Sequence, residues 1–365
     1  MSMDNIRINQ DEKKIILVLN PGSTSTKVAL YYDDVCLLER SVSHTQEELE
    51  LDVFDQVRVR QQVIERLFAE AGISVRDLSA IAARGGRIRP VSSGVYRMND
   101  QIIYDSINGT SGKHASALAV LIARELTADS NCPVFVVDPV SVDELLPEAR
   151  LSGLKEIERK SLGHALNSKA VALRAARDLG ESYKDVNLVI AHIGGGTTIS
   201  AHRKGQMIDI INDFEGGFTP ERAGGLPTIE LINLCFSGKY TQEQLMRKIE
   251  GEGGFYSYLG TKDIKEIEDR IEAGDPQSIL VMKAYLLQLS KSIGSLMAVL
   301  SFLVDAFCIT GGIAYSQRVT SFLKETFSSI APVFIYPGSF ETETLAKRVL
   351  AVLNGDEIPK TYPGG

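Results

Sequence analysis

The sequence has little of several features that mark particular classes of protein. Its 365 residues include only four cysteines, and no two of these form a C-x-x-C pair. This favours the reduced thiols of a cytosolic protein over a disulfide framework or a zinc site. A formal net charge of −8 provides no basic surplus for binding nucleic acid, but it leaves room for local cationic pockets that bind anions.

Long apolar runs are also missing. The most apolar region, residues 279–307, is interrupted by Lys283, Lys291 and Asp305, so we interpret it as a core helix followed by a strand rather than a membrane span. Residues 1–14 are polar and charged, which does not fit a signal peptide. We therefore expect a cytoplasmic protein, long enough for two domains that each have a hydrophobic core.

The most informative stretch that is present is a polar turn near the N-terminus. The sequence IILVLNPGSTSTKVAL (residues 15–30) predicts a strand at 15–19, a turn, and a second strand at 26–30. Glycine and hydroxyl residues in this turn offer backbone N–H and side-chain O–H donors, which suit an anion or a phosphate group. An ordinary hydroxyl-rich hairpin is the alternative.

A second copy of this pattern, LVIAHIGGGTTISA (residues 188–201), occurs 172 positions later. Asn20 corresponds to His192 and Gly22 to Gly194, and each copy continues into a third predicted strand, at 35–42 and at 207–211. Two such units in register predict an internal duplication. If the two turns face one another, they would hold a polyphosphate from both sides.

Two glycine-flanked segments carry arginines that could meet an anion. A predicted strand at 78–83 runs into RGGRIRP (84–90), and ligands of α/β proteins bind at the carboxyl ends of strands. We therefore favour Arg84 as a ligand contact over a solvated basic loop. The glycine-rich segment 211–227 contains a single arginine, Arg222, and loops of this length are either functional or disordered. A surface arginine is the alternative for Arg222.

Other polar residues lie where predicted elements begin or end. Asp138 follows the apolar strand 133–137, a position that suits either a catalytic or metal-binding carboxylate or a turn-forming aspartate. His114 and His164 lie near helix starts, where a histidine can meet an anion or serve only as a cap. The Thr310–Gly312 turn links a strand to a helix and exposes bare backbone on which a ribose or a flat ring could lie.

Taken in order, these motifs resemble those of the acetate/butyrate kinase family, within the actin–Hsp70–sugar kinase superfold. The resemblance covers nearly the whole chain and is carried by NPGSTSTK, RGGRIRP, HAS, VVDPV, ERKSxxHALN, HIGGGTT, FTPERAGGLP and ITGGI. The forms of RGGRIRP and ERAGGLP are more similar to the butyrate kinase branch than to acetate kinases.

The resemblance implies an α/β fold of two duplicated ribonuclease H-like or actin-like ATPase domains (βββαβαβα) flanking a nucleotide cleft. We expect domains at 1–183 and 184–344, and a C-terminal helix within 345–365 that packs back on the first domain. The implied reaction is the reversible, Mg²⁺- and ATP-dependent phosphorylation of butyrate, or of a related short- or branched-chain fatty acid, to its acyl phosphate. A homodimer or higher homo-oligomer is also implied.

Roles for individual residues follow from the same resemblance. Catalytic roles are implied for Arg84, His114, Asp138, His164 and Arg222. The two phosphate loops and the adenosine site would comprise Asn20, Ser23, Thr24, Ser25, Thr26, Lys27, His192, Gly194, Gly195, Gly196, Thr197, Thr198, Gly311, Gly312 and Ile313. Asp138 and Glu341 would approach the magnesium ion, with Glu343 as the alternative to Glu341.

The chain departs from the family pattern at two positions. Gly163 precedes His164, where family members usually have a phenylalanine that faces the acyl chain, and Ala117 replaces an asparagine of butyrate kinases. We expect Gly163, with Gly85 and Gly86, to leave a roomier pocket for four- or five-carbon and branched acids, unless Gly163 marks a degraded site.

Two other functions remain open from the sequence. An ATPase or sensor of the same superfold would hydrolyse ATP without a carboxylate acceptor, and a binding protein would keep the fold without turnover. The residue types favour the kinase, because a carboxylate is already ionised at pH 7 and needs no general base. Its barrier is the approach of an anion to a phosphate, which arginines and Mg²⁺ lower.

Overall fold

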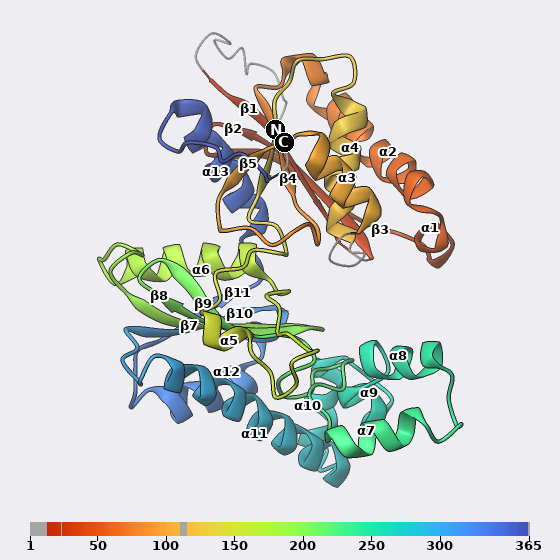
Figure 1. The fold of residues 1–365 in the computed structure, drawn as a ribbon, viewed down its shortest axis with the longest axis vertical. Helices are drawn as coiled ribbons and strands as arrows, with labels where there is room; N and C mark the ends of the chain where they lie inside the picture. Colours follow the sequence, from red (N-terminus) through yellow and green to blue (C-terminus); the bar gives the residue numbers. More distant parts are fainter. Residues whose placement is uncertain (1–12, 23, 110–114, 364–365) are drawn as a thin grey trace. The chain divides into compact units, whose positions relative to one another are not determined.

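The computed structural model describes residues 13–22, 24–109 and 115–363. The chain forms two compact units, Met1–Val142 with Phe340–Gly365, and Asp143–Ser339 (Figure 1). Among the described residues, no helix is both long and apolar enough to cross a lipid bilayer. Each unit is built on a mixed sheet with helices on both faces.

The first unit contains a six-stranded sheet in the order β3-β2-β1-β4-β6-β5. Its strands are β1 (Ile15–Pro21), β2 (Ser25–Tyr32), β3 (Val35–Ser43), β4 (Ala80–Arg84), β5 (Val95–Arg97) and β6 (Val134–Val137). The first three strands form an antiparallel meander, whereas β4 runs parallel to β1, and β6 runs parallel to β4. Strand β1 is a continuous apolar run because it is central and covered on both faces.

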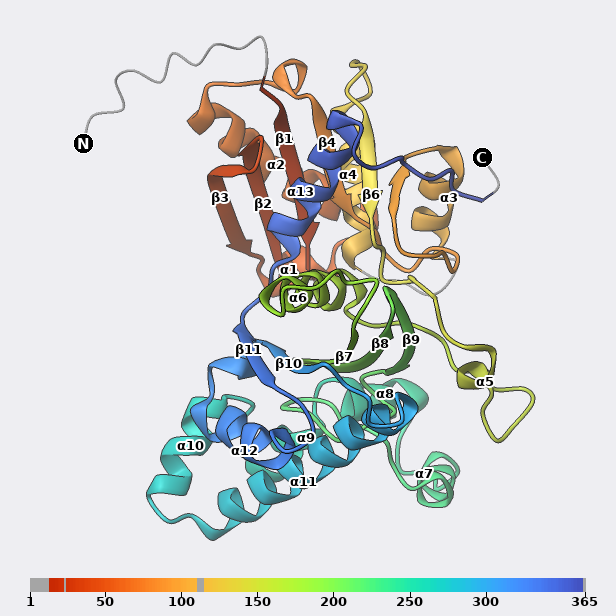
Figure 2. The same cartoon turned by 90° about the vertical axis from the view of Figure 1, so that its left-hand side faces the viewer.

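Helices α2 (Val53–Ala71) and α4 (Leu118–Leu126) cover one face of this sheet, and α13 (Glu341–Asn354) lies against β1 and β4 on the other (Figures 1 and 2). The shorter helices are α1 (Gln46–Glu50) and α3 (Asp100–Asn108), and α3 packs on α4. Asn99 caps α3 by accepting the backbone N–H of Ile102 at 2.9 Å.

The second unit contains a five-stranded sheet in the order β11-β10-β7-β8-β9. Its strands are β7 (Asn187–Ile193), β8 (Thr197–Arg203), β9 (Gln206–Ile211), β10 (Ala306–Gly311) and β11 (Val333–Pro337). An antiparallel meander is again followed by strands parallel to its first member. The order matches β6-β4-β1-β2-β3 of the first unit, which confirms the predicted duplication.

Helix α6 (Ala165–Asp178) covers one face of the second sheet and α11 (Pro276–Val299) the other. The remaining helices are α5 (Pro147–Arg150), α7 (Thr228–Cys235), α8 (Gln242–Glu250), α9 (Gly254–Leu259), α10 (Ile264–Glu272) and α12 (Gln317–Phe327). The sequence at 251–254 and 256–260 favours a flexible connector, but the structure forms α9 there. Phe255 of α9 is fully buried, and its ring centroid lies 4.9 Å from that of Tyr285.

The division by contacts differs from the domain boundaries predicted at 183/184 and 344/345. Helix α6 packs against β7 and β10 and so belongs with the second sheet, although it precedes the repeated hairpin in the sequence. Helix α13 packs against β1 and β4, which returns the C-terminal end of the chain to the first unit.

Candidate active site

The first unit brings together three of the predicted site residues, Asn20, Arg84 and Glu341. The Nδ2 atom of Asn20 donates to Oε2 of Glu341 at 2.9 Å, Arg84 Nη2 lies 3.2 Å from Glu341 Oε1, and Arg84 Nη1 donates to Asn20 Oδ1 at 3.3 Å. Leu19 pairs with Ala83 in the parallel β1–β4 ladder, so Asn20 and Arg84 follow neighbouring strand positions. Helix α13 then supplies Glu341 from its first turn.

This cluster is almost closed to water yet keeps one donor without an acceptor. The side chains of Arg84 and Glu341 are 13% and 9% exposed. The buried Nε of Arg84 has no hydrogen-bond partner among the described residues, which leaves it able to donate to an anion. Glu343, the alternative to Glu341, pairs instead with Lys347 at the surface.

The rest of the first hairpin turn is less suited to phosphate. Thr26 is buried, and its hydroxyl oxygen lies 2.8 Å from Arg60 Nη1 and 2.7 Å from His44 Nε2. It therefore links β2 to helix α2 and to the residue that follows β3. Lys27 pairs with Glu39 on the adjacent strand at 3.3 Å. Ser23 and His114 lie outside the described residues. The predicted phosphate-binding roles of Thr26 and Lys27 therefore gain no support from their contacts.

In the second unit, two predicted histidines form a stacked pair. His164 is the N-terminal cap residue of α6 and His192 lies on β7; their ring centroids are 4.0 Å apart and the rings are inclined by 8°. His164 Nδ1 lies 2.9 Å from the hydroxyl of Thr198. The Nδ2 of Asn167 lies 2.8 Å from His192 Nδ1. Because an amide NH₂ can only donate, this contact requires the tautomer of His192 in which Nδ1 accepts.

Asn167 contacts predicted site residues, although the sequence patterns assigned it no role. It is fully buried, and its Nδ2 also lies 3.3 Å from the hydroxyl of Thr310 on β10. The signal that could have found it is spacing: it follows His164 by three residues, so both side chains lie on one face of α6. Asn167 therefore connects the histidine pair to the strand that leads into the predicted adenosine site.

The glycine turn between β7 and β8 is covered by the loop at 212–227. Thr219 Oγ1 donates to the carbonyl of Gly195 at 2.5 Å. A Cβ atom on Gly196 would lie 2.6 Å from Asp213 Oδ1, and one on Gly195 would lie 3.0 Å from Glu221 Oε1. Two carboxylates thus approach these glycines closely, which no sequence pattern singled out. The buried hydroxyl of Thr197 has no partner among the described residues.

Arg222 repeats, in the second unit, the arrangement of Arg84. Its Nη1 lies 2.9 Å from Asp213 Oδ2, and its guanidinium carbon lies 5.5 Å from the ring centroid of Phe214. The buried Nε again has no hydrogen-bond partner within the described part of the chain. Each predicted arginine is therefore oriented by a carboxylate and keeps a donor for a further anion.

The predicted adenosine turn has the expected bare backbone but a different local structure. Gly311 adopts φ +90°, and a Cβ atom there would collide with the carbonyl of Ile193, so only glycine fits. Gly312 faces open space, because a Cβ atom added there would have no neighbouring atom within 4 Å. Gly312–Tyr315 forms a 3₁₀ turn, and α12 begins only at Gln317. Ile313 is 6% exposed and packs in the core, so its side chain is not an open contact.

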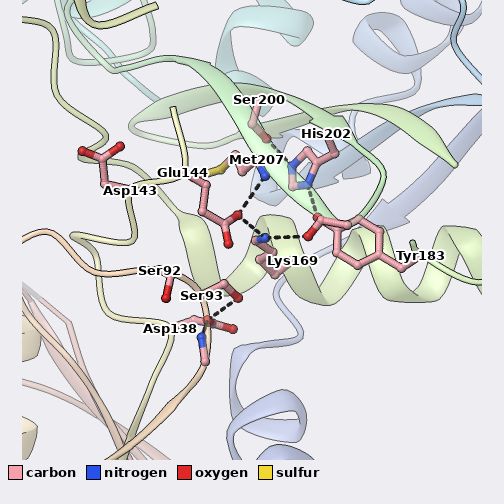
Figure 3. A network of polar contacts seen from close by, with 12 residues as sticks. Ser92, Ser93, Asp138, Asp143, Glu144, Lys169, Tyr183, Ser200, His202 and Met207 are labelled. Carbon is pink, nitrogen blue, oxygen red and sulfur yellow. Dashed lines mark hydrogen bonds and ion pairs between the residues drawn. The ribbon is translucent and has the colours of Figure 1, made fainter. Parts of the chain in front are cut away.

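Asp138 is engaged in a structural role. Its Oδ1 accepts from Ser93 Oγ at 2.7 Å (Figure 3) and from the backbone N–H of Gly94 at 2.8 Å, while Oδ2 accepts from Arg348 Nη1 at 2.9 Å. The residue is 1% exposed and adopts φ 37°. These contacts favour the turn-forming alternative over a metal ligand. In the described ranges, no cluster of three or more His, Cys, Asp or Glu side chains is arranged to hold a metal ion.

The three glycines that were expected to widen an acyl pocket are in tight packing instead. A Cβ atom on Gly85 would lie 2.5 Å from Pro139 Cβ, and one on Gly86 would lie 2.7 Å from Ala117 Cβ. On Gly163 it would lie 2.6 Å from Ile210 Cδ1. Neighbouring atoms already fill the space beside each glycine. The structure thus gives close packing, rather than a roomier pocket, as the reason for glycine at these positions.

We expect Gly163→Ala to destabilise the protein by about 1–3 kcal/mol, because the added methyl group overpacks a filled region. It would also press on Thr198, whose Cγ2 would lie 2.7 Å away, and through it on His164. Chemical denaturation would measure the change. Adding Ile210→Val, which removes the nearest methyl group, should recover part of the loss; an unchanged stability of Gly163→Ala would contradict the packing argument.

Comparisons with known proteins place this geometry in a family. Residues 155–329 match the model of the acetokinase family. Among solved structures, an acetate kinase from Porphyromonas gingivalis superposes with a TM-score of 0.78 at 17% identity, covering 93% of this chain and 100% of that one. A propionate kinase from Francisella tularensis gives a TM-score of 0.74 at 17% identity, covering 92% and 98%. These two structures confirm the predicted fold class.

Curated relatives are similar over nearly the full length. "Butyrate kinase 1" of Clostridium acetobutylicum is 44% identical over 351 residues, which cover 95% of this chain and 99% of that protein. "Probable butyrate kinase" of Clostridium botulinum has the same identity and coverage. Together with the matched family model, this similarity shows that the chain belongs to the acetokinase family.

Proposed function

We propose that this protein is a carboxylate kinase that transfers a phosphoryl group from ATP to butyrate, or to a related short- or branched-chain fatty acid, to form the acyl phosphate. The reaction is reversible. The full-length similarity to butyrate kinases supports the reaction and this class of acid. The observation that carries the chemistry is the pair of arginines, Arg84 and Arg222, each held by a carboxylate with its Nε still available.

These residues suit an acceptor that needs no general base. A carboxylate nucleophile is ionised at neutral pH, and the one buried aspartate that the sequence offered as a catalytic carboxylate, Asp138, is neutralised by Arg348. The main requirement is to bring two anions together and to stabilise charge on the phosphoryl oxygens. Guanidinium donors from Arg84 and Arg222, together with the histidine pair, would meet that requirement.

ATP and Mg²⁺ would bind to different groups of the predicted site. In the second unit, the backbone of Gly194–Gly196 and the hydroxyl of Thr197 would hold phosphates, and the open backbone at Gly312 would suit the nucleoside. The lack of a partner for the Thr197 hydroxyl among the described residues and the open space at Gly312 support this proposal.

Mg²⁺ usually keeps several waters and binds through one or two carboxylates plus substrate phosphates. Glu341 would be the carboxylate that approaches the ion, although it already accepts from Asn20 and pairs with Arg84. Asp138 accepts three hydrogen bonds from protein donors.

A homo-oligomer and a cytoplasmic location also form part of the proposal. Helix α7 is apolar but has no buried residue, and Ile229, Ile232 and Phe236 along it are 68%, 48% and 87% exposed. A second copy of the chain would shield such a surface. The four cysteines are unpaired, which supports a reducing compartment.

A panel of acids from two to six carbons, assayed with hydroxylamine to trap acyl phosphate, tests the function. We expect an ATP-dependent signal that is larger with butyrate and isobutyrate than with acetate. A clear preference for acetate would contradict the proposed substrate. ATP hydrolysis that gives no trapped product with any acid would instead favour the superfold ATPase.

A further inference from the structure

Helix α6, which presents His164 at its N-terminal end, is attached to the second sheet by a buried ion pair (Figure 3). The side chain of Lys169 is 3% exposed, and its Nζ lies 2.5 Å from Oε2 of Glu144, which is 10% exposed. The same Oε2 accepts the backbone N–H of Met207 at 2.9 Å, and Nζ donates to the carbonyl of Gly205 at 3.2 Å. The segment before α5, helix α6 and the β8–β9 hairpin therefore meet at one pair of charges.

A buried ion pair at this position is not required for packing. Two apolar side chains of similar size would fill the same volume without the cost of removing two charges from water. Lys169 and Glu144 add a directional restraint. Their hydrogen bonds are favourable at only one relative position of the two segments, whereas apolar contacts permit small sliding movements. The pair therefore fixes the position of α6 along its own axis relative to the second sheet.

A second attachment holds the opposite end of the helix. Along β8, side chains alternate between the two faces, so Thr198, Ser200 and His202 share one face, and all three are buried. Thr198 contacts His164 at the start of α6. Beyond its end, the hydroxyl of Tyr183 lies 2.7 Å from His202 Nδ1, and Ser200 Oγ lies 2.8 Å from His202 Nε2.

The second attachment uses an uncharged ring. Burial, together with the nearby charge of Lys169, lowers the pKa of His202 well below its usual value, so the imidazole is neutral at pH 7. Lys169 also lies 5.4 Å from the ring centroid of Tyr183. The two attachments are therefore parts of one network, whose members are joined in Figure 3.

We propose that Lys169 and Glu144 are positioning residues, which set the position of α6 so that His164 stays stacked on His192 during phosphoryl transfer. The proposal rests on the proposed kinase function. Lys169 follows His164 by five residues, about 7.5 Å along the helix axis, so it acts through the helix and not on the reacting atoms. Misplacing a reacting group by 1 Å can lower a rate by about 100-fold.

The first test replaces the ion pair by apolar side chains of similar length. In the double variant Lys169→Met/Glu144→Met, neither charge is left buried alone, so the protein should fold. We expect kcat to fall by at least about 10-fold, while KM for ATP and for butyrate changes by less than about three-fold. Lys169→Arg, which keeps the charge, should retain most of kcat.

A matched control uses another ion pair on the same connecting segment. Asp143 pairs with Arg150 of α5 and does not attach to α6. The double variant Asp143→Asn/Arg150→Met should keep kcat within about two-fold of the unaltered enzyme, because it loosens the same segment but leaves the Lys169–Glu144 pair in place. An equal loss of kcat in both double variants would mean that general loosening of the unit, rather than the position of α6, is responsible.

A double-mutant cycle separates positioning from a general structural role. If the pair acts through His164, adding Lys169→Met/Glu144→Met to His164→Ala should lower kcat by no more than about two-fold. If the two losses multiply, the inference is wrong.

The imidazole NMR signals of His164 provide a measurement that does not depend on activity. They should shift in Lys169→Met/Glu144→Met and stay unchanged in the Asp143/Arg150 control. Unaltered His164 signals in the first variant would overturn the inference, whatever the enzyme's activity. Absence of acyl phosphate with the unaltered enzyme would overturn only the proposed function.

Discussion

Arg222→Met should lower kcat/KM for butyrate by about 10²–10³-fold, the loss typical of removing one preorganised donor to a developing anion. The side chain is 27% exposed and is oriented by Asp213, and its Nε has no acceptor among the described residues. Methionine keeps the length of the side chain but offers neither charge nor N–H groups. Steady-state kinetics with the acyl phosphate trap would measure the loss.

Two further variants sharpen this prediction. Arg222→Lys should recover only part of the activity, since an ammonium group cannot contact Asp213 and a ligand with a rigid fork of donors. Arg247→Met removes a more exposed guanidinium, whose side chain is 62% exposed, and should leave kcat/KM nearly unchanged. If Arg222→Met keeps more than about a third of the original kcat/KM, no donor of the expected kind has been lost.

Asp138→Asn should destabilise the protein by about 1–3 kcal/mol, because the amide replaces a buried carboxylate oxygen that accepts a hydrogen bond, while Arg348 keeps its ion pair with Glu357. Asp138 is 1% exposed and receives three hydrogen bonds from Ser93, Gly94 and Arg348. Denaturant unfolding of the full chain would measure the loss of free energy. The kcat of the folded enzyme should change by less than about three-fold, since the expected loss lies in stability and not in the transition state.

The opposite result would restore the role that the sequence predicted for Asp138. A catalytic or metal-binding aspartate would give a variant of normal stability and a kcat lowered by about 100-fold or more. Arg348→Met is the matched control. It leaves the buried Asp138 carboxylate without an ionic partner and should destabilise the protein at least as much.

The duplicated framework could be predicted because its signals are local. An apolar run, a glycine and hydroxyl turn and a second apolar run occur twice, and the sheet orders of the two units agree with that repeat. The positions of Arg84 and Asn20 followed from the same logic, since both come at the carboxyl ends of predicted strands. The helix start expected near His164 was likewise confirmed, because α6 begins at Ala165.

The partners of several predicted residues could not be derived in this way. Asp138 and Arg348 are 210 positions apart, and neither carries a local pattern that marks the other. At positions 85, 86 and 163 the sequence shows only a glycine, which can line an open pocket or sit in a tight contact. Only the neighbouring Pro139, Ala117 and Ile210 distinguish the two cases. Helix α9 was missed because its glycine-rich surroundings resemble a loop.

Because α13 packs against β1 and β4, the first unit cannot complete its fold early in synthesis. Asn20 receives its contact with Glu341 from a residue 321 positions later, so this cluster cannot form until the ribosome has made residue 341. The second unit, Asp143–Ser339, is continuous in sequence and can fold as a block while translation proceeds. Nascent chains therefore lack the Asn20–Glu341 contact until helix α13 has left the ribosome.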